Sequence, residues 1–221
     1  MRSCWEKVLR YERVAPEEIE RRSFEIITEE LARRGVALPE DRAFLIKRAI
    51  HATADFDYAQ TLQISDGAIQ TFAAAIRDGA VVVTDTNMAL AGVNKNELAR
   101  YGASARCFMA EPDVAEEARE RGVTRATVGV ERALALETPC VFVVGNAPTA
   151  LMRLRDAFDA GARVPRVVVG VPVGFVNVEA AKEAIMETTI PYIVNVGRKG
   201  GSSVAAAICN AILYEMRKGA L

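Results

Sequence analysis

The sequence predicts an α/β protein, a three-layer α/β/α sandwich built on a mostly parallel five-stranded sheet. Short β-branched runs recur along the chain and read as continuously apolar, which is typical of strands covered on both faces. Segments with helical spacing lie between these runs, as in βαβ units. The expected strands are Ala80–Thr84, Ala105–Met109, Cys140–Val144, Arg166–Gly170 and Tyr192–Val196.

The helices expected between and after these strands carry start signals. Pro112 stands at a favourable first helical position, and Asn177 and Ser202 are plausible N-caps. The expected helices are Lys95–Tyr101, Pro112–Arg121, Thr124–Glu137, Thr149–Ala160, Val178–Thr188 and Ser202–Lys218. Strands and helices therefore alternate from Ala80 to the end of the chain.

An additional helical region is expected ahead of the sheet. Its helices are Pro16–Arg34, Asp41–Ala52 and Asp66–Asp78. In the first of them Phe24, Ile27 and Leu31 share one helical row, a face that can be buried against the α/β body or a partner subunit. Because the sequence shows no repeat, Ser/Gly linker or charge block, residues 1–221 are expected to form a single domain.

Composition and charge exclude several classes of protein. The 221 residues carry a formal net charge of −1, which argues against a nucleic-acid-binding protein. Four scattered cysteines form no CxxC motif, so we expect a reduced, cytoplasmic protein without a zinc knuckle. A charged N-terminus excludes a signal peptide, and the longest apolar stretch, Val167–Val176, is too short for a membrane helix. Neither a nucleic-acid nor a membrane partner is expected.

Three polar loops follow expected strands, where open parallel sheets bind ligands. They are Asp85–Met88, Gly145–Thr149 and Gly197–Ser203. The last offers glycines, a helix N-terminus, and the cations Arg198 and Lys199, which suit an anion. The alternative is a tight turn that needs glycine, with both cations solvated. Since neither GxxxxGK[ST] nor GxGxxG occurs, carboxylate is favoured over nucleotide phosphate.

His51 is the single histidine and the leading candidate for acid–base chemistry. If its segment is helical, Lys47 and Arg48 share its face and disfavour the imidazolium form, so the ring stays neutral until a ligand carboxylate offsets them. The alternative is a helix-end histidine satisfied by a backbone carbonyl. A metal site is disfavoured because no second histidine exists.

Other polar residues admit two readings each. Asp55 and Asp57 either orient the imidazole or cap a turn, which is the commoner role. Asp85 stands where a signalling receiver domain carries its phosphorylated aspartate, but no acidic pair accompanies it to hold magnesium. Arg125 opens a helix and contacts either a ligand or water.

Taken in order, these segments resemble the precorrin-8X methylmutase family of corrin-ring biosynthesis. The blocks GNAPTAL at 145–151, GVPVGFV at 170–176 and GRKGGS at 197–202 carry the resemblance. Further matching segments are RSFEII at 22–27, HATADF at 51–56, TDTNM at 84–88, AGV at 91–93 and TR at 124–125. The sequence departs from the family at Asn195, where other members often carry different polar or basic residues, and this affects one expected rim contact.

The resemblance implies a flavodoxin-like subunit, a homodimer with its site near the interface, and a tetrapyrrole substrate with many carboxylate arms. The reaction implied is the shift of a methyl group from C-11 to C-12 of the macrocycle, giving hydrogenobyrinate, with no cofactor consumed and with tight product binding before hand-off to the next enzyme. His51 takes the place of the family's catalytic histidine. The implied substrate contacts are Ser23, Arg48, Thr86, Arg125, Arg198, Lys199, Gly200, Gly201 and Ser202.

The proposed chemistry needs one proton donor beside a conjugated ring and several groups that hold its carboxylates. Phe56, Met88 and Phe175 either line the ring's face or belong to the core. Two rival functions are a non-catalytic carrier of an anionic tetrapyrrole on the same loops, and a receiver-like module phosphorylated at Asp85.

Overall fold

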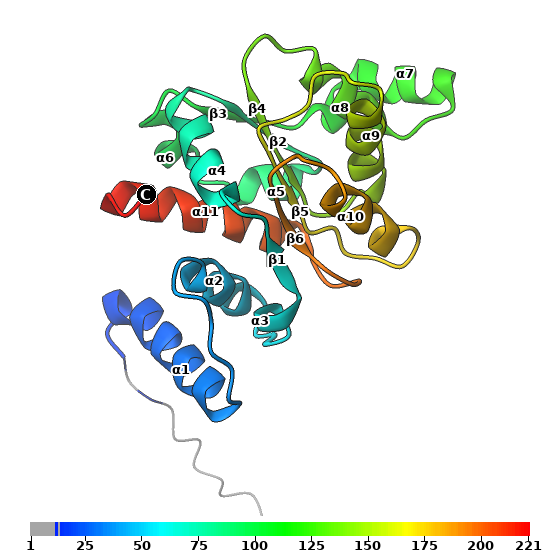
Figure 1. The fold of residues 1–221 in the computed structure, drawn as a ribbon. Helices are drawn as coiled ribbons and strands as arrows, with labels where there is room; N and C mark the ends of the chain where they lie inside the picture. Colours follow the sequence, from blue (N-terminus) through cyan, green and yellow to red (C-terminus); the bar gives the residue numbers. More distant parts are fainter. Residues whose placement is uncertain (1–11, 13) are drawn as a thin grey trace, which may run out of the picture. The chain divides into compact units, whose positions relative to one another are not determined.

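The computed structural model describes residue 12 and residues 14–221, and the chain separates into two compact units, Met1–Ala37 and Leu38–Leu221 (Figure 1). The first unit contains a short 3₁₀ turn at Pro16–Glu18 and helix α1, Ile19–Arg33, as its spacing predicts. The second unit holds the sheet and every other element described here. That the whole chain is one domain stays a prediction.

One sheet of six strands forms the centre of the second unit. Its strands are β1 (Leu62–Ile64), β2 (Val81–Thr84), β3 (Ser104–Arg106), β4 (Cys140–Val144), β5 (Val167–Gly170) and β6 (Tyr192–Asn195). They lie in the order β1-β6-β5-β4-β2-β3, and every pairing is parallel except that of β1 with β6. The mostly parallel sheet is therefore confirmed, whereas the count of five strands was one short.

The strand missed in the sequence is the antiparallel edge strand β1. It has three residues, Leu62, Gln63 and Ile64, too few to form a recognisable period-2 pattern. Its hydrogen bonds to β6 define it, and these depend on where the chain returns. The expected strand at 105–109 was also wrong in part, because Phe108–Ala110 forms a 3₁₀ turn after β3.

Helices cover both faces of the sheet, which confirms the layered α/β architecture (Figure 1). On one face α4 (Ala68–Arg77) and α11 (Ser202–Lys218) contact β4 and β5, and α11 in turn contacts α2 (Ala43–Thr53), α5 (Asn87–Gly92) and α6 (Lys95–Ala99). The helices on the other face are α7 (Pro112–Arg121), α8 (Arg125–Leu134), α9 (Pro148–Asp159) and α10 (Val178–Met186). A one-turn helix, α3 (Tyr58–Thr61), precedes β1.

Strand β4 shows how the two faces are filled. Cys140, Phe142 and Val144 join the buried cluster that includes Leu151 and Leu154 of α9. The alternate residues of β4 are equally buried and do not belong to this cluster, as period-2 geometry requires of a strand covered on both sides.

The helix starts agree with the sequence in part. Pro112 begins α7 and Thr124 caps α8 by accepting from the Thr127 N–H. Ser202 is the first residue of α11, and Gly201 occupies the N-cap, so the predicted serine cap is wrong. Asn177 precedes α10 in a left-handed conformation and makes no side-chain capping bond.

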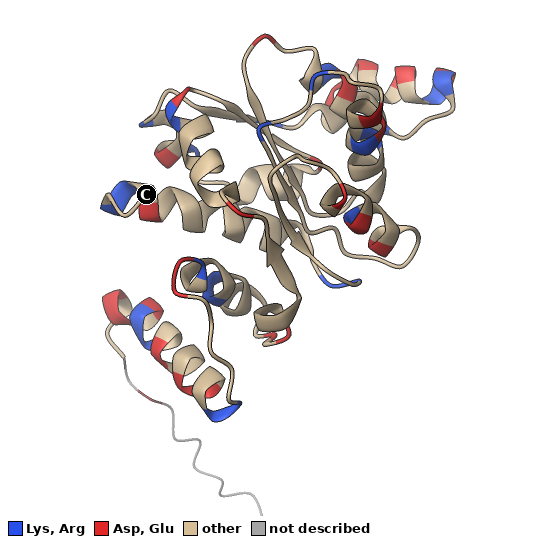
Figure 2. Cartoon of the chain, in the orientation of Figure 1, with Lys and Arg blue, Asp and Glu red and all other residues tan. Residues whose placement is uncertain are grey.

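Charged residues gather on the outward helices α7, α8 and α9 (Figure 2). Arg132 pairs with Asp113 and Glu117, while Arg121 and Arg153 pair with Glu131. These arginines therefore form ion pairs between the surface helices α7, α8 and α9. Of the helices in the described part of the chain, none has the length and apolar character needed to span a bilayer.

We expect Leu151→Ala to lower the free energy of unfolding by about 2–5 kcal/mol, because it leaves a cavity in the core under α9. The neighbouring Met152, 40% exposed, provides the matched control, and Met152→Ala should cost less than about 1 kcal/mol. Urea unfolding monitored by circular dichroism measures both. Equal losses would contradict the assignment of this face as the core.

Candidate functional site

The carboxyl edge of the sheet is held together by the buried side chain of Asp85, directly after β2. Its Oδ1 accepts from the Gly145 N–H at 2.9 Å, and its Oδ2 accepts from the Asn146 and Ala147 N–H groups at 2.7 and 2.6 Å. Burial raises the pKa of Asp85, and these three hydrogen bonds oppose that shift. Both oxygens are occupied by backbone, so Asp85 is a structural tie between two loops and does not resemble an open phosphoacceptor.

The loop from β6 to α11 packs closely against its neighbours. Thr86, the N-cap of α5, lies with its Oγ1 2.8 Å from Ser202 Oγ. Gly201, at φ 136°, donates its N–H to Val171 O at 2.9 Å. A Cβ on Gly200 would stand 2.0 Å from Val171 O, so only glycine fits there. The close packing and positive φ explain these glycines without a ligand.

The two cations of this loop are both paired. Lys199 Nζ lies 2.6 Å from Asp55 Oδ2 and 2.6 Å from Asp57 Oδ2, and its ammonium lowers the pKa of Asp55. Arg198 Nε donates to Glu179 Oε2 at 3.1 Å, and its guanidinium lies 5.6 Å from the centre of the Phe175 ring. Lys199 thus ties the segment after His51 to the glycine-rich loop.

Asp55 also caps its own turn, as its residue type favours. Its Oδ1 accepts from the Asp57 N–H at 3.0 Å, so the turn-capping role is confirmed. The sequence did not predict the ion pairs of Asp55 and Asp57 with Lys199. Lys199 lies 142 residues beyond Asp57, and no local pattern connects positions that far apart.

A buried lysine of α10 is hydrogen-bonded to the backbone of the same loop. Lys182 is 1% exposed, and its ammonium donates to Gly197 O at 2.6 Å and to Lys199 O at 2.9 Å. Burial lowers the pKa of Lys182 to about 8. The sequence did contain a signal for it, since Lys182 stands on the helical row of the buried residues Val178 and Ile185.

Asn195, at the end of β6, is fully buried and is not a rim contact. Its Oδ1 accepts from Thr61 Oγ1 at 2.7 Å, and its Nδ2 donates to Lys199 O at 3.0 Å. The expectation of a rim residue is therefore wrong: this amide joins the strand end to α3 and to the loop.

His51 lies in the last turn of α2 and is exposed, with Lys47 and Arg48 on the same helical face. Arg48 is half-buried, and its guanidinium lies 5.6 Å from the centre of the Tyr214 ring of α11. Tyr214 is twelve residues beyond Ser202, roughly 18 Å along the helix. Arg48 therefore contacts the far part of α11, away from the glycine-rich loop.

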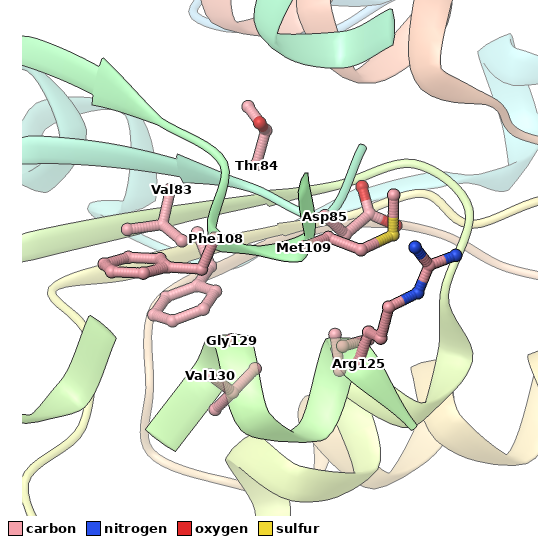
Figure 3. Close-up of a pocket in the computed structure, with 11 residues that line it drawn as sticks. Val83, Thr84, Asp85, Phe108, Met109, Arg125, Gly129 and Val130 are labelled. Carbon is pink, nitrogen blue, oxygen red and sulfur yellow. The ribbon is translucent and has the colours of Figure 1, made fainter. Parts of the chain in front are cut away.

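Arg125 lines a small pocket between α8, the end of β2 and Phe142 of β4 (Figure 3). Its side chain reaches from α8 toward Met109 and Asp85, and the pocket is narrow, with an internal volume of about 20 Å³. Thr124 Oγ1 lies 2.9 Å from Thr149 Oγ1, which joins the start of α8 to the GNAPT loop. Small-molecule sites usually span about 300–1,000 Å³, so this pocket is too small to enclose a ligand, and Arg125 is what it contributes to the site.

Two apolar side chains predicted either as ring-facing or core are exposed. Met88 is 73% exposed on α5, and Phe175 is 81% exposed on the loop after β5, which excludes a core role in the subunit; Phe56 is half-buried. Ser23 lies in α1, in the other unit, and its hydroxyl donates to Ile19 O at 2.8 Å.

Comparison with known proteins identifies the family. The family model of precorrin-8X methylmutase matches residues 18–215. The chain belongs to the precorrin-8X methylmutase family. It is 43% identical to the cobalt-precorrin-8 methylmutase of Salmonella typhimurium, over 92% of this chain and 97% of that protein. It is 38% identical to the precorrin-8X methylmutase of Pseudomonas aeruginosa, over 89% of this chain and 94% of that protein.

A solved structure agrees with this result. The crystal structure of precorrin-8X methylmutase from Thermus thermophilus superposes with a TM-score of 0.82 at 36% identity, covering 92% of this chain and all of that one. The methylmutase family resemblance inferred from the sequence motifs is confirmed. The receiver-like alternative is excluded by the family and by the backbone contacts of Asp85.

We expect Asp85→Asn to lower the free energy of unfolding by roughly 2–4 kcal/mol, because an amide places an NH₂ group against backbone N–H donors. Asp78→Asn, at an exposed carboxylate after α4, is the matched control and should change stability by less than about 0.5 kcal/mol. Denaturant unfolding compares the two. A stability loss at Asp85 no larger than that of the control would show that the tie is unimportant.

The buried ammonium of Lys182 predicts a dependence of stability on pH. The folded pKa is lowered from 10.5 to about 8, so between these values the unfolded chain binds more protons, and stability rises with pH. The free energy of unfolding of the unsubstituted chain, relative to Lys182→Met, should therefore increase by up to about 3 kcal/mol from about pH 7.5 to 10. Urea unfolding across this range gives the difference; a constant difference would refute the prediction.

Proposed function

We propose that this chain is an isomerase that converts precorrin-8X or cobalt-precorrin-8 to hydrogenobyrinate or cobyrinate, by moving a methyl group from C-11 to C-12 of the ring in cobalamin biosynthesis. The family match over residues 18–215 supports the reaction class. Cobalt, where present, belongs to the substrate.

The observation that carries this proposal is the placement of His51. Its exposed imidazole stands at the end of α2, and the segment that follows is joined by Lys199 to the glycine-rich loop. A macrocycle that docks on this edge can thus meet a proton donor and an anion-binding loop together. Because His51 is on the surface, a ring too large for a closed pocket can reach it.

His51 would donate a proton or hydrogen bond to the conjugated system beside the migrating methyl group and recover the proton afterwards. This makes the π-system electron-poor and favours migration. General acid–base assistance of this kind contributes about 10²- to 10⁴-fold in rate. The rest of the acceleration comes from holding the ring in one register.

The carboxylate arms would be held by groups from several loops. The guanidinium of Arg125 suits a single arm, while Thr86, Ser202 and the backbone of residues 198–200 suit another. The exposed Met88 and Phe175 offer apolar surface to the face of the ring. Arg48 and Ser23 are further proposed contacts.

We further propose a flavodoxin-like subunit that acts as a cytoplasmic homodimer, with the N-terminal helical region at the contact and product passed to the next enzyme. The strand order supports the fold: counted from β2, the parallel strands follow the order 2-1-3-4-5 of flavodoxin-like sheets.

We expect His51→Ala to retain substrate binding and to lose turnover by about 10²- to 10⁴-fold, since the side chain supplies the proton but few contacts. Purified protein is mixed with precorrin-8X, and the absorbance change of the conjugated ring is followed while binding is measured by gel filtration of the coloured complex. Lys218→Ala, at an exposed lysine near the end of α11, is the control and should keep most activity.

Two outcomes would contradict the proposal. Turnover unchanged by His51→Ala would remove His51 as the proton donor. A chain that binds the tetrapyrrole without any absorbance change, whether or not His51 is substituted, would be the non-catalytic carrier.

A further inference from the structure

Lys182 is an unusual residue to find fully buried beside a surface loop. Its ammonium makes two short hydrogen bonds, to Gly197 O and Lys199 O, and the carbonyl of Lys199 also accepts from Asn195 Nδ2. The charged groups around it are engaged elsewhere: Glu179, one turn earlier on α10, pairs with Arg198, and Lys199 pairs with Asp55 and Asp57. The contacts of Lys182 are thus with loop carbonyls.

These contacts fix the orientation of two peptide groups. The peptide bond is planar and trans, so its N–H points away from its C=O. The carbonyl of Gly197 shares a peptide with the N–H of Arg198, and the carbonyl of Lys199 shares one with the N–H of Gly200. Because both carbonyls point at Lys182, both N–H groups point away from it.

The two N–H groups are left available. Within the part of the chain that the structure describes, neither the Arg198 nor the Gly200 N–H has a hydrogen-bond partner. Gly201, next in the loop, differs because its N–H is used by Val171 O. Alternate N–H groups in one short loop therefore face the same general direction with free donor capacity, which suits an anion.

We propose that Lys182 is a positioning residue that aims the backbone N–H groups of Arg198 and Gly200 at one carboxylate arm of the corrin substrate. The inference rests on the proposed function. It assigns carboxylate binding by this loop to its backbone N–H groups and not to its side chains. It explains how a loop whose cationic side chains are already paired with carboxylates can still bind an anion. Lys182 touches the loop and not the substrate.

The first test uses the unsubstituted protein and the product hydrogenobyrinate. Amide NMR signals of Arg198 and Gly200 should move downfield and gain protection from hydrogen exchange when the product binds, because their N–H groups then donate to a carboxylate. The amide of Gly201 should change least of the three, since it already has a partner. Binding without any response at Arg198 and Gly200 would overturn the inference.

The second test compares Lys182→Met with Lys182→Arg and with the control Lys218→Met, at an exposed lysine near the end of α11. Lys182→Met should weaken product binding by about 10- to 100-fold, Lys182→Arg should restore part of the loss, and Lys218→Met should bind normally. Binding of an analogue whose carboxylates are all amidated should be almost the same in all of these proteins.

The comparison separates positioning from a general structural effect. If Lys182→Met weakens the acid and the amidated analogue equally, or weakens neither, Lys182 does not aim donors at a carboxylate. If Lys182→Met does not fold, the NMR measurement on the unsubstituted protein still decides. Failure of the unsubstituted protein to bind or convert any corrinoid would instead contradict the proposed function.

Discussion

The carboxyl edge of the sheet depends on the contact between the Asp85 carboxylate and three consecutive backbone N–H groups. Parallel strands bring their carboxyl ends to one edge, so the loops after β2 and β4 meet there, and their backbone N–H groups need acceptors outside the strand ladder. A buried carboxylate satisfies three of those donors at once. With this tie in place, Thr86 can meet Ser202, and the start of α11 is held against the same edge.

The cations in and under the loop between β6 and α11 are all paired within the protein. Lys199 and Arg198 pair with carboxylates, and Lys182 donates to two backbone carbonyls. Cations that are paired in this manner hold segments in register and lose much of their attraction for an outside anion. Backbone N–H groups then become the donors that remain, and the bonds from Lys182 and Asn195 to the loop carbonyls orient their peptide groups.

The dimensions of the site also fit a large ligand better than a small one. The pocket beside Arg125, about 20 Å³, is too small to enclose a ligand, whereas His51, Met88 and Phe175 stand on open surface. A flat macrocycle bearing several acidic arms can be gripped at its edge by separate loops while its face lies on exposed apolar side chains. Such an arrangement suits a reaction that needs precise placement of one carbon and a single proton.

The sequence by itself determined the parallel strands, most helices, the polar loops at their ends and the family, because each depends on a local pattern of residues. It also led us to propose His51 and Arg125 as site residues, because both stand within short recognisable motifs. Only the tertiary structure decided that β1 pairs with β6, that Lys199 binds Asp55 and Asp57, that Asn195 is buried and that Lys182 lies under the loop. These contacts join residues far apart in the chain, and no local pattern records which distant group a side chain will meet once the strands are aligned.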